Sequence, residues 1–294
     1  MKKRLLFGAL AIASIGFTAT SCSSDSEDTG TNSPITNNPG NGNGNGNGAS
    51  TTAKYEHKTL IEDYTGAWCG WCPRVSHSIE LVKAHATLGD KIIPVAIHTS
   101  DVMQISASNA IRNLFGVNSF PTAYVNRTAK WNSPENNNLA QIYNSINQQG
   151  SSIGIKIASN LTNAGGTVTA TFRFSEGYEN LKYHVFVLEN GVTRTDDPQQ
   201  NYTNFYNGED VLPNFVHNDV LMAVSGTATG NSLGTVTAGQ EIVKDNQGVT
   251  FSLNNNDLSK VDVVVFITDS TGKKVLNAQI AHANQTKDFV IVSQ

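Results

Sequence analysis

The chain has 294 residues, of which 38% are hydrophobic and 15% charged, and its formal net charge is −4. This acidic balance gives no reason to expect a nucleic-acid partner, because such binding depends on clustered Lys and Arg. With only three cysteines and no paired-histidine spacing, the sequence gives no reason to expect a structural zinc site, which needs four ligands.

The first 21 residues have the pattern of a bacterial signal peptide. Residues 2–4 are basic, and residues 5–17 form an apolar run that is too short to span a bilayer. The Ala-Thr-Ser-Cys segment that follows resembles a lipobox, in which Cys22 would be lipidated and become the first mature residue. The alternative is an ordinary signal peptide with an incidental cysteine. Removal of residues 1–21 would take away three positive charges and change the net charge from −4 to −7.

Residues 22–54 are predicted to be the lipidated cysteine and a flexible tether. Residues 41–48 alternate Asn and Gly, and such a segment cannot bury enough apolar surface to offset its chain entropy. The acidic tract at residues 23–28 resembles the surface-export signal of Bacteroidetes lipoproteins. We therefore expect a cell-envelope protein with a lipid anchor in the outer membrane, either surface-exposed or facing the periplasm.

Residues 55–150 show alternating strand and helix patterns. Strands are expected at residues 57–64, 91–98 and 123–126, and helices at residues 73–88, 105–115 and 133–146. The expected core face of the first helix consists of Val75, Ile79, Val82 and Ala86.

Between the first strand and the first helix lies the sequence Cys69-Gly70-Trp71-Cys72. Two cysteines separated by two residues in this context are typical of a redox pair. At a helix N-terminus the macrodipole and the unpaired N–H groups favour the thiolate, which is the species that attacks a disulfide. An inert structural disulfide and a metal site are the alternatives.

This motif and its surroundings resemble the active-site segment of the thioredoxin superfamily. Asp63 stands six residues before the first cysteine, where thioredoxins carry a buried aspartate, and residues 119–122 (Ser-Phe-Pro-Thr) resemble their cis-proline turn. The resemblance covers about residues 55–150 and implies an α/β thioredoxin-like domain. Trp71 stands where the superfamily pattern has proline, which leaves the direction of the redox reaction open.

The resemblance also implies chemical roles. Cys69, exposed at the helix start, would be the attacking thiolate, and Cys72, one turn further on and more buried, would resolve the mixed disulfide. Asp63, if buried near the pair, would have a raised pKa and would relay the proton of Cys72. Glu62 competes with Asp63 for this role.

Five further residues are predicted to contact a substrate. A cis Pro121 would place the backbone of Phe120 and Thr122 beside the sulfurs, where it would hydrogen-bond an extended substrate strand. Trp68 and Trp71 would shield the disulfide and offer an apolar docking surface, or would serve packing alone. Three histidines are expected to be surface residues rather than general bases, namely His77, His85 and His98.

From residue 151 the pattern changes to the period of two that is typical of strands. Strands are expected at residues 153–157, 168–174, 183–188, 220–224, 249–253, 261–268 and 274–280. About seven strands without a clear helix predict an all-β immunoglobulin-like sandwich over residues 151–294. The irregular segment 193–212 carries Tyr202, Phe205 and Tyr206, which either form a binding surface or fix the loop to its own sheet.

The lipobox, the tether, the segment at residues 62–69 and the β-rich second half together resemble one family, the Bacteroidetes lipoproteins related to outer-membrane protein twenty-eight. We expect a protein thiol–disulfide oxidoreductase of the cell envelope, with protein thiols or disulfides as substrates and no cofactor or metal. The alternative is a surface binding or adhesion lipoprotein in which Cys69 and Cys72 form an inert disulfide. The sequence leaves open the substrate, the direction of electron flow and the oligomeric state.

Overall fold

The computed structural model describes residues 50–293, so Cys22 and most of the predicted tether lie outside the described residues. Ala53 is already buried, and β1 (Lys54–Tyr55) pairs with β16 (Ile291–Ser293) near the other end of the chain. Within the described residues, the structure contains no helix whose length and apolar character would suffice to cross a membrane.

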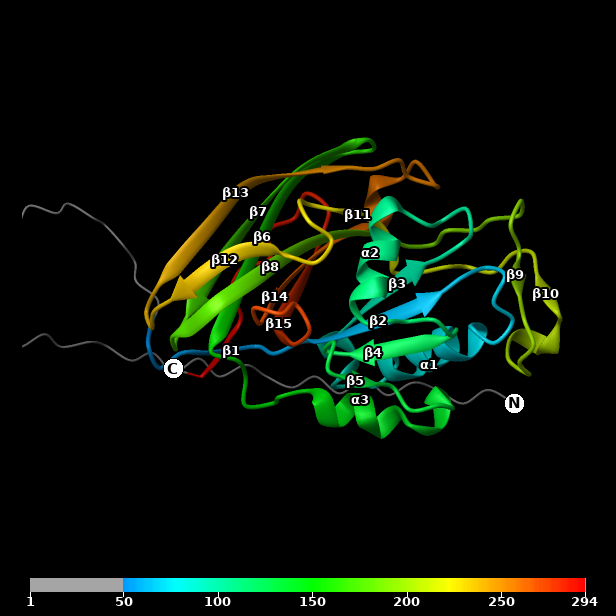
Figure 1. The fold of residues 1–294 in the computed structure, drawn as a ribbon, viewed down its shortest axis with the longest axis horizontal. Coiled ribbons are helices and arrows are strands. Elements are labelled where there is room, and N and C mark those ends of the chain that lie inside the picture. The colour runs from blue at the N-terminus through cyan, green and yellow to red at the C-terminus, as the bar shows by residue number, and fades with distance from the viewer. Residues whose placement is uncertain (1–49, 294) are drawn as a thin grey trace, which may run out of the picture. The chain divides into compact units, whose positions relative to one another are not determined.

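The first half of the described chain forms strands and helices in the predicted order (Figure 1). The elements are β2 (Thr59–Thr65), α1 (Pro73–Lys83), η1 (Gly89–Lys91), β3 (Ile92–His98), α2 (Ser106–Leu114), β4 (Thr122–Val125), β5 (Ala129–Lys130), η2 (Glu135–Asn137) and α3 (Leu139–Ser145). Strand β2 runs parallel to β3 and antiparallel to β4.

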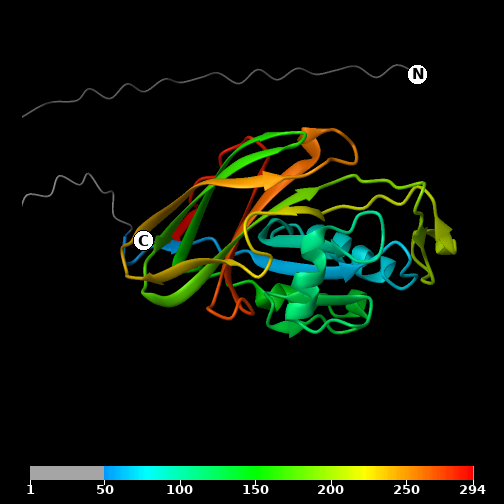
Figure 2. The same ribbon diagram turned by 45° about the horizontal axis from the view of Figure 1, so that its top comes forward.

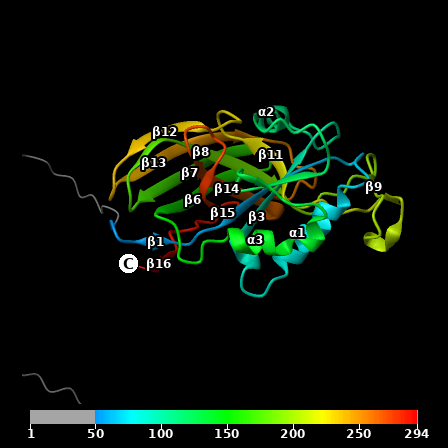
Figure 3. The same ribbon diagram turned by 60° about the horizontal axis from the view of Figure 1, so that its bottom comes forward.

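The helices cover both faces of this part of the sheet, with α2 on one face and α1 and α3 on the other (Figure 3). Successive side chains of β2 therefore enter different cores. Leu60 and Tyr64 pack with Ile111 of α2, whereas Ile61 packs with Val75 of α1. Burial on both faces explains why every residue of β2 is buried.

Helix α1 ends five residues earlier than the predicted residue 88. Val75, Ile79 and Val82 form its buried face, as expected, but Ala86 is exposed and lies beyond the helix. Beyond the C-cap at Ala84 the chain turns, and Leu88 rather than Ala86 packs against the core of this helix.

The second half of the described chain is mainly strands. They are β6 (Ile153–Thr162), β7 (Gly165–Phe174), β8 (Tyr178–Glu189), β9 (Gln199–Gln200), β10 (Val211–Leu212), β11 (Val220–Val224), β12 (Asn231–Val236), β13 (Glu241–Thr250), β14 (Val261–Thr268) and β15 (Val275–His282), with short 3-10 turns η3 (Tyr206–Gly208) and η4 (Leu258–Lys260). Of the expected strand at residues 249–253, only residues 249 and 250 lie in a strand, at the end of β13, and β12 was not expected. Both are solvent-facing strands with few apolar residues, so their period is weak.

One sheet connects the two halves. Its strand order is β15-β14-β8-β11-β3-β2-β4-β5, with β12 also paired to β8. The junction is the parallel pairing of Val220 on β11 with Ala96 on β3, where the N–H of Ala96 donates to the carbonyl of Asp219 at 2.8 Å. Because strands from both sides of residue 151 share this sheet, the predicted two-domain arrangement is not confirmed. The fold is mixed α/β, with mostly sheets and few helices.

A second sheet, of order β13-β7-β6, lies at the end of the described unit away from the helices (Figure 2). Its apolar side chains pack against alternate residues of β8 and β14, such as Val185 and Val263. The intervening residues of these strands, such as Phe186 and Phe266, enter the core beneath α2. Strands β8 and β14 are thus buried on both faces, which accounts for their nearly continuous apolar sequence.

A buried ion pair also connects the two halves. Arg127, after β4, donates to both carboxylate oxygens of Glu62, with the shortest contact at 2.7 Å, and both side chains are fully buried. Its Nη1 donates to the carbonyl of Gly272, between β14 and β15, at 2.9 Å. The guanidinium lies over the rings of Phe115 and Phe266, at 5.6 and 4.8 Å from their centroids. Arg127 therefore joins β2, α2 and the β14–β15 hairpin.

Candidate active site

A disulfide joins Cys69 and Cys72, whose Cα atoms lie 5.4 Å apart. Cys72 is the N-cap of α1, and Pro73 occupies the first helical position, where the missing N–H costs nothing. The N–H of Cys69 donates to the carbonyl of Gly66, and the N–H of Cys72 to the carbonyl of Cys69, so a tight turn leads into the helix. The pair lies where the N–H groups of α1 favour a thiolate.

The prediction that Cys69 is exposed is wrong. Cys69 is 4% exposed and Cys72 is 1% exposed. The two neighbouring tryptophans are instead the exposed residues, Trp68 at 45% and Trp71 at 52%. A segment of the second half of the chain, residues 199–212, lies against the backbone of the motif.

Trp68 connects the motif to the turn at residues 119–122. Its indole N–H donates to the carbonyl of Thr99 at 2.7 Å, and its ring meets that of Phe120 edge-to-face at 5.3 Å. A Cβ at Gly66 would lie 2.5 Å from the indole nitrogen, so this position requires glycine. The Phe120–Pro121 peptide is cis, as the resemblance implied. The turn thus lies beside the residue that precedes Cys69.

The turn is fixed by Thr122, the first residue of β4. Its hydroxyl donates to the carbonyl of Ser119 at 2.8 Å, and its backbone pairs with Tyr64 of β2. Thr122 is buried, whereas Phe120 and Pro121 are half-buried. Of these three predicted contact residues, Phe120 and Pro121 are accessible to a second molecule.

Asp63 and Glu62 occupy opposite faces of β2. Asp63 is 2% exposed, and its Oδ1 has no hydrogen-bond partner among the described residues. Burial, with a smaller contribution from Glu135, raises the pKa of Asp63 well above its usual value. Glu62 is held by Arg127 and is not available for proton transfer. The expected burial and raised pKa of Asp63 are therefore confirmed, whereas Glu62 no longer competes for its role.

Asp63 borders a cavity of about 340 Å³ between β2, β3, α1 and residues 215–219. Lys83 and Asp219 also line this cavity and form an ion pair at 3.3 Å, with Lys83 partly exposed and Asp219 buried. Burial raises the pKa of Asp219 although Lys83 opposes this. The cavity leads from the buried carboxyl of Asp63 to the charged end of α1.

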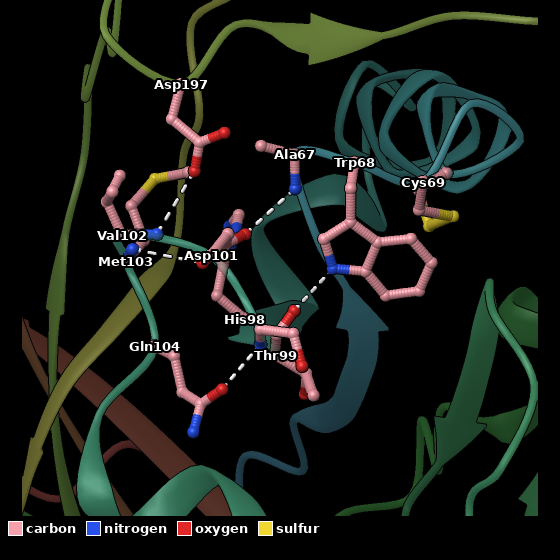
Figure 4. Close-up of polar contacts among 12 residues, drawn as sticks. Ala67, Trp68, Cys69, His98, Thr99, Asp101, Val102, Met103, Gln104 and Asp197 are labelled. Atoms are coloured by element: carbon pink, nitrogen blue, oxygen red, sulfur yellow. Dashed lines mark hydrogen bonds and ion pairs between the residues drawn. A yellow bond between two sulfur atoms is a disulfide. The ribbon is translucent and has the colours of Figure 1, made fainter.

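A polar cluster fixes the loop between β2 and the motif (Figure 4). Asp101 accepts hydrogen bonds from the N–H of Ala67 at 2.8 Å and of Met103 at 3.0 Å, and its Oδ2 lies 2.6 Å from Nδ1 of His98. Burial would raise the pKa of Asp101, but the bonds from His98 and from the backbone lower it below its usual value. The ring of His217 lies 5.2 Å from that of His98, and burial lowers the pKa of His217 to about 3.

His98 was expected at the surface but is 2% exposed. It ends β3 next to the end of β2, and parallel strands bring such ends together. The other two histidines are accessible: His85 is exposed and packs on Tyr143, while His77 is half-exposed and stacks on Phe205 at 4.2 Å. No described contact joins either of them to the cysteines.

Residues 199–212, which we term the cover segment, lie next to the start of α1 (Figures 1 and 3). The N–H of Gln200 donates to the carbonyl of Ala67 at 2.7 Å, and the N–H of Tyr202 to that of Gly70 at 2.6 Å. The buried side chain of Gln199 donates to the carbonyl of Cys69 at 3.1 Å. The cover segment is therefore attached to the backbone of the motif itself.

Aromatic residues of the cover segment pack on the motif and on α1. The ring of Tyr202 lies against Gly70, where an added Cβ would approach it to 2.4 Å, and meets Trp71 edge-to-face at 6.1 Å. Phe205 stacks on His77, and the hydroxyl of Tyr206 donates to Glu80 at 3.1 Å. These rings fix the loop to the disulfide site and not to its own sheet.

Sequence reasoning missed the contributions of Asp101, His217 and Gln199. A weak signal existed for Asp101, because a His-x-x-Asp pattern directly after a buried strand places polar groups at a sheet edge where sites form. Gln199 gives no local signal, since the carbonyl that it reaches is 130 residues away in the chain.

The described chain is a mixed α/β protein with a Cys-x-x-Cys disulfide at the start of a helix. The family model "Outer membrane protein Omp28" matches residues 108–287, more than half of the chain, so the chain belongs to the Omp28 family. This family description points to the outer membrane. The matched region includes the cis-proline turn, Arg127 and the cover segment, and Cys69 and Cys72 precede it.

Among solved structures, HBP35 of Porphyromonas gingivalis is similar, with a TM-score of 0.59 and 18% sequence identity over 80% of this chain and 77% of that chain. A crystal structure of a protein from Agrobacterium tumefaciens has a TM-score of 0.45 and 12% identity over 80% of this chain and 98% of that chain. At this identity the likeness to HBP35 shows the fold alone. No curated protein matches the chain.

Proposed function

We propose that this chain is an outer-membrane lipoprotein that carries out thiol–disulfide exchange through Cys69 and Cys72, and that residues 55–150 form its thioredoxin-like part. One observation carries the proposal: the disulfide lies at the start of α1, with Trp68 connecting it to the cis Phe120–Pro121 turn. A purely structural disulfide has no need of a helix N-terminus, which stabilises a thiolate.

The envelope location is supported by two independent features. The family description names the outer membrane, and residues 1–22 have the pattern of a lipoprotein signal with Cys22 as the lipidated residue. An oxidising envelope is also a compartment in which disulfides persist. Protein thiols or disulfides are the substrates, and the lipid on Cys22 is the membrane partner.

The exchange begins when a substrate thiolate attacks Sγ of Cys69. A bond forms between the two sulfurs, the Cys69–Cys72 bond breaks, and its electron pair leaves on Sγ of Cys72. A second substrate thiolate then attacks the substrate sulfur of this mixed disulfide and releases Cys69 as a thiolate. Two substrate thiols are thereby oxidised to a disulfide, and the cysteine pair gains two electrons. The reverse sequence reduces a substrate disulfide.

Asp63 would transfer the proton in these steps. Its raised pKa keeps the carboxyl protonated at a pH where an ordinary aspartate is ionised, so it would protonate Cys72 when that sulfur leaves. In the reverse direction the Asp63 carboxylate would accept the proton of Cys72. Trp68, Trp71, Phe120 and Pro121 would contact the substrate, since all four are exposed or half-buried.

The reduction potential of the pair tests the proposal. Full-length chain carrying Cys22→Ser, kept in non-ionic detergent, would be equilibrated with glutathione buffers and its free thiols counted. We expect a value between roughly −120 and −270 mV, the range of catalytic pairs. A value below about −300 mV is typical of structural disulfides and would contradict the proposal.

A matched pair of variants tests which sulfur is attacked. Cys72→Ser leaves Cys69 without its resolving partner, so mixed disulfides with other proteins should accumulate. Cys69→Ser should accumulate none, because in the proposed roles Cys72 resolves the mixed disulfide and does not attack the substrate. Non-reducing electrophoresis measures both, and equal trapping by the two variants would refute these roles.

A second candidate function is supported by the low exposure of Cys69 and Cys72. A surface binding lipoprotein with an inert disulfide would also bury both sulfurs, and its exposed aromatic residues, Trp68, Trp71 and Tyr202, would then serve as a binding surface. The potential separates the two candidates, because an inert disulfide predicts the lower value.

A further inference from the structure

Two backbone N–H groups of the cover segment reach the motif. Gln200 and Tyr202, two residues apart, both direct their N–H groups to carbonyls of the motif, those of Ala67 and Gly70. The two accepting carbonyls lie three residues apart in the turn before α1, so they hold the cover segment at two points rather than in a β ladder. Both bonds use only the backbone of the cover segment, and any extended peptide can supply them.

The side-chain contacts define what else fits at this surface. The Cα of Gly70 and the ring of Trp71 form a shelf on which the ring of Tyr202 rests. Trp71 remains 52% exposed and Tyr202 59% exposed, so the shelf opens to solvent. An aromatic side chain from another protein would find the same flat apolar contact there.

Little of the cover segment is deeply buried, although Tyr202, Phe205 and Tyr206 pack on the motif and on α1. Of residues 199–212 only Gln199, Asn201, Thr203 and Leu212 are buried, and residues 207–211 are all exposed. The side chain of Asn201 forms its hydrogen bonds within the cover segment: it accepts from Thr203 and donates to the carbonyls of Phe205 and Glu209. Segments with little apolar burial open at low free energy.

The ends of the loop are fixed independently of the motif. Val192 and His217 exchange backbone hydrogen bonds at 2.9 and 2.8 Å, and these bonds close the base of the loop next to β8 and β11. The cover segment can therefore leave the motif while its base stays in place.

We propose that the cover segment occupies the surface on which a protein substrate binds, and that this substrate is an extended chain with an aromatic side chain close to its reactive cysteine. The inference rests on the proposed exchange activity. With the cover segment in place, Cys69 is closed to such a chain. Displacement frees the carbonyls of Ala67 and Gly70 and the shelf on Trp71, and the exchange then follows the steps already given.

Substitution of Tyr202 tests this closure. Tyr202→Ala removes the ring that rests on Gly70 and should speed exchange with reduced, unfolded ribonuclease A roughly 3- to 10-fold, which corresponds to the usual strength of an aromatic pair. Tyr202→Phe keeps the ring and should react at the rate of the unsubstituted chain. An unchanged or slower rate in Tyr202→Ala would overturn the proposal.

A peptide tests the class of substrate. A synthetic peptide with the sequence of residues 199–206 should slow the exchange of the Tyr202→Ala variant with ribonuclease A, because it fills the vacated surface. The same peptide with alanine in place of its first tyrosine should inhibit at least several-fold less well. Equal inhibition by both peptides, or none by either, would contradict an aromatic-binding shelf.

Amide hydrogen exchange separates failure of this inference from failure of the proposed function, since it needs no redox reaction. The N–H groups of Gln200 and Tyr202 should exchange at least tenfold faster than that of Ala96, which lies at the centre of the sheet, and Tyr202→Ala should speed the exchange of Gln200. If Gln200 exchanges as slowly as Ala96, the cover segment does not open and the inference fails. If the cover segment opens but the reduction potential of Cys69 and Cys72 is that of a structural disulfide, the proposed exchange activity is contradicted, and with it the protein substrate, while the opening of the cover segment stands.

Discussion

The adjacent carboxyl groups of Glu62 and Asp63 lie on opposite faces of β2 and have different surroundings. Glu62 and Asp63 are both buried, at 0% and 2% exposure. Glu62 meets the guanidinium of Arg127 in a bidentate pair, whereas Asp63 keeps one oxygen without a protein partner among the described residues and has a raised pKa. Burial alone therefore does not identify a reactive carboxyl group. The partner distinguishes the two groups, because Arg127 pairs with Glu62, whereas burial raises the pKa of the unpaired Asp63.

The largest effect on stability is expected from removing the partner of Glu62. Arg127→Met should leave Glu62 buried without a counter-charge and lower the free energy of unfolding by about 3–5 kcal/mol. Urea denaturation measures this value. In the double variant Glu62→Leu/Arg127→Met, no charge remains unpaired, so most of the loss should be recovered. A double variant as unstable as Arg127→Met would show that the guanidinium acts mainly through its contacts with Gly272 and the two rings.

The unpaired carboxyl group of Asp63 should make the free energy of unfolding depend on pH. Above about pH 4 the unfolded chain ionises Asp63 while the folded chain keeps it protonated, so unfolding is favoured as the pH rises. This should cost about 1.4 kcal/mol of stability for each pH unit up to the raised pKa and remain constant above it. Asp63→Asn removes the titrating group, so the variant should gain stability relative to the unsubstituted chain as the pH increases from 4 towards neutrality.

The free energy of unfolding, measured at pH 4, 5, 6 and 7, checks this expectation. The gain in stability of Asp63→Asn over the unsubstituted chain should be smallest at pH 4. A difference that does not change with pH would mean that Asp63 is ionised in the folded chain and cannot supply a proton to Cys72.

The smallest effect is expected for the ion pair at the edge of the cavity. Lys83 is 44% exposed at its side chain, so Lys83→Met should lower the free energy of unfolding by about 1 kcal/mol or less. The loss should shrink in 1 M NaCl, where exposed pairs are screened. Lys273→Met, at an exposed lysine without an ion pair among the described residues, is the matched control. A loss of stability as large as that of Arg127→Met would show that the Lys83–Asp219 pair behaves energetically as a buried ion pair.

Much of the fold followed from local patterns. Strand β2, the Cys-x-x-Cys segment, the start of α1 and the turn at Pro121 were all predicted within one or two residues, because each has its signal inside a few neighbouring positions. Strands β8 and β14 were also predicted, since strands buried on both faces show unbroken apolar runs.

The features that were missed depend on contacts between distant parts of the chain. The shared sheet forms through a single parallel pairing of β3 with β11, to which no local pattern points. Gln199 and Tyr202 contact the motif across about 130 residues. The position of Asp63 relative to Cys69 favoured it over Glu62, but the pairing of Glu62 with Arg127, 65 residues away, has no local signal.

The contact between Gly70 and Tyr202 has a consequence for how this redox motif can change. The two residues between the cysteines of such motifs are commonly regarded as an independent setting for the reduction potential. Here the ring of Tyr202 lies where a side chain at position 70 would begin, so a larger residue there would have to displace this ring or be matched by a smaller residue at position 202. A substitution at position 70 would therefore also act on the cover segment, although the cover segment and the motif lie in different halves of the chain.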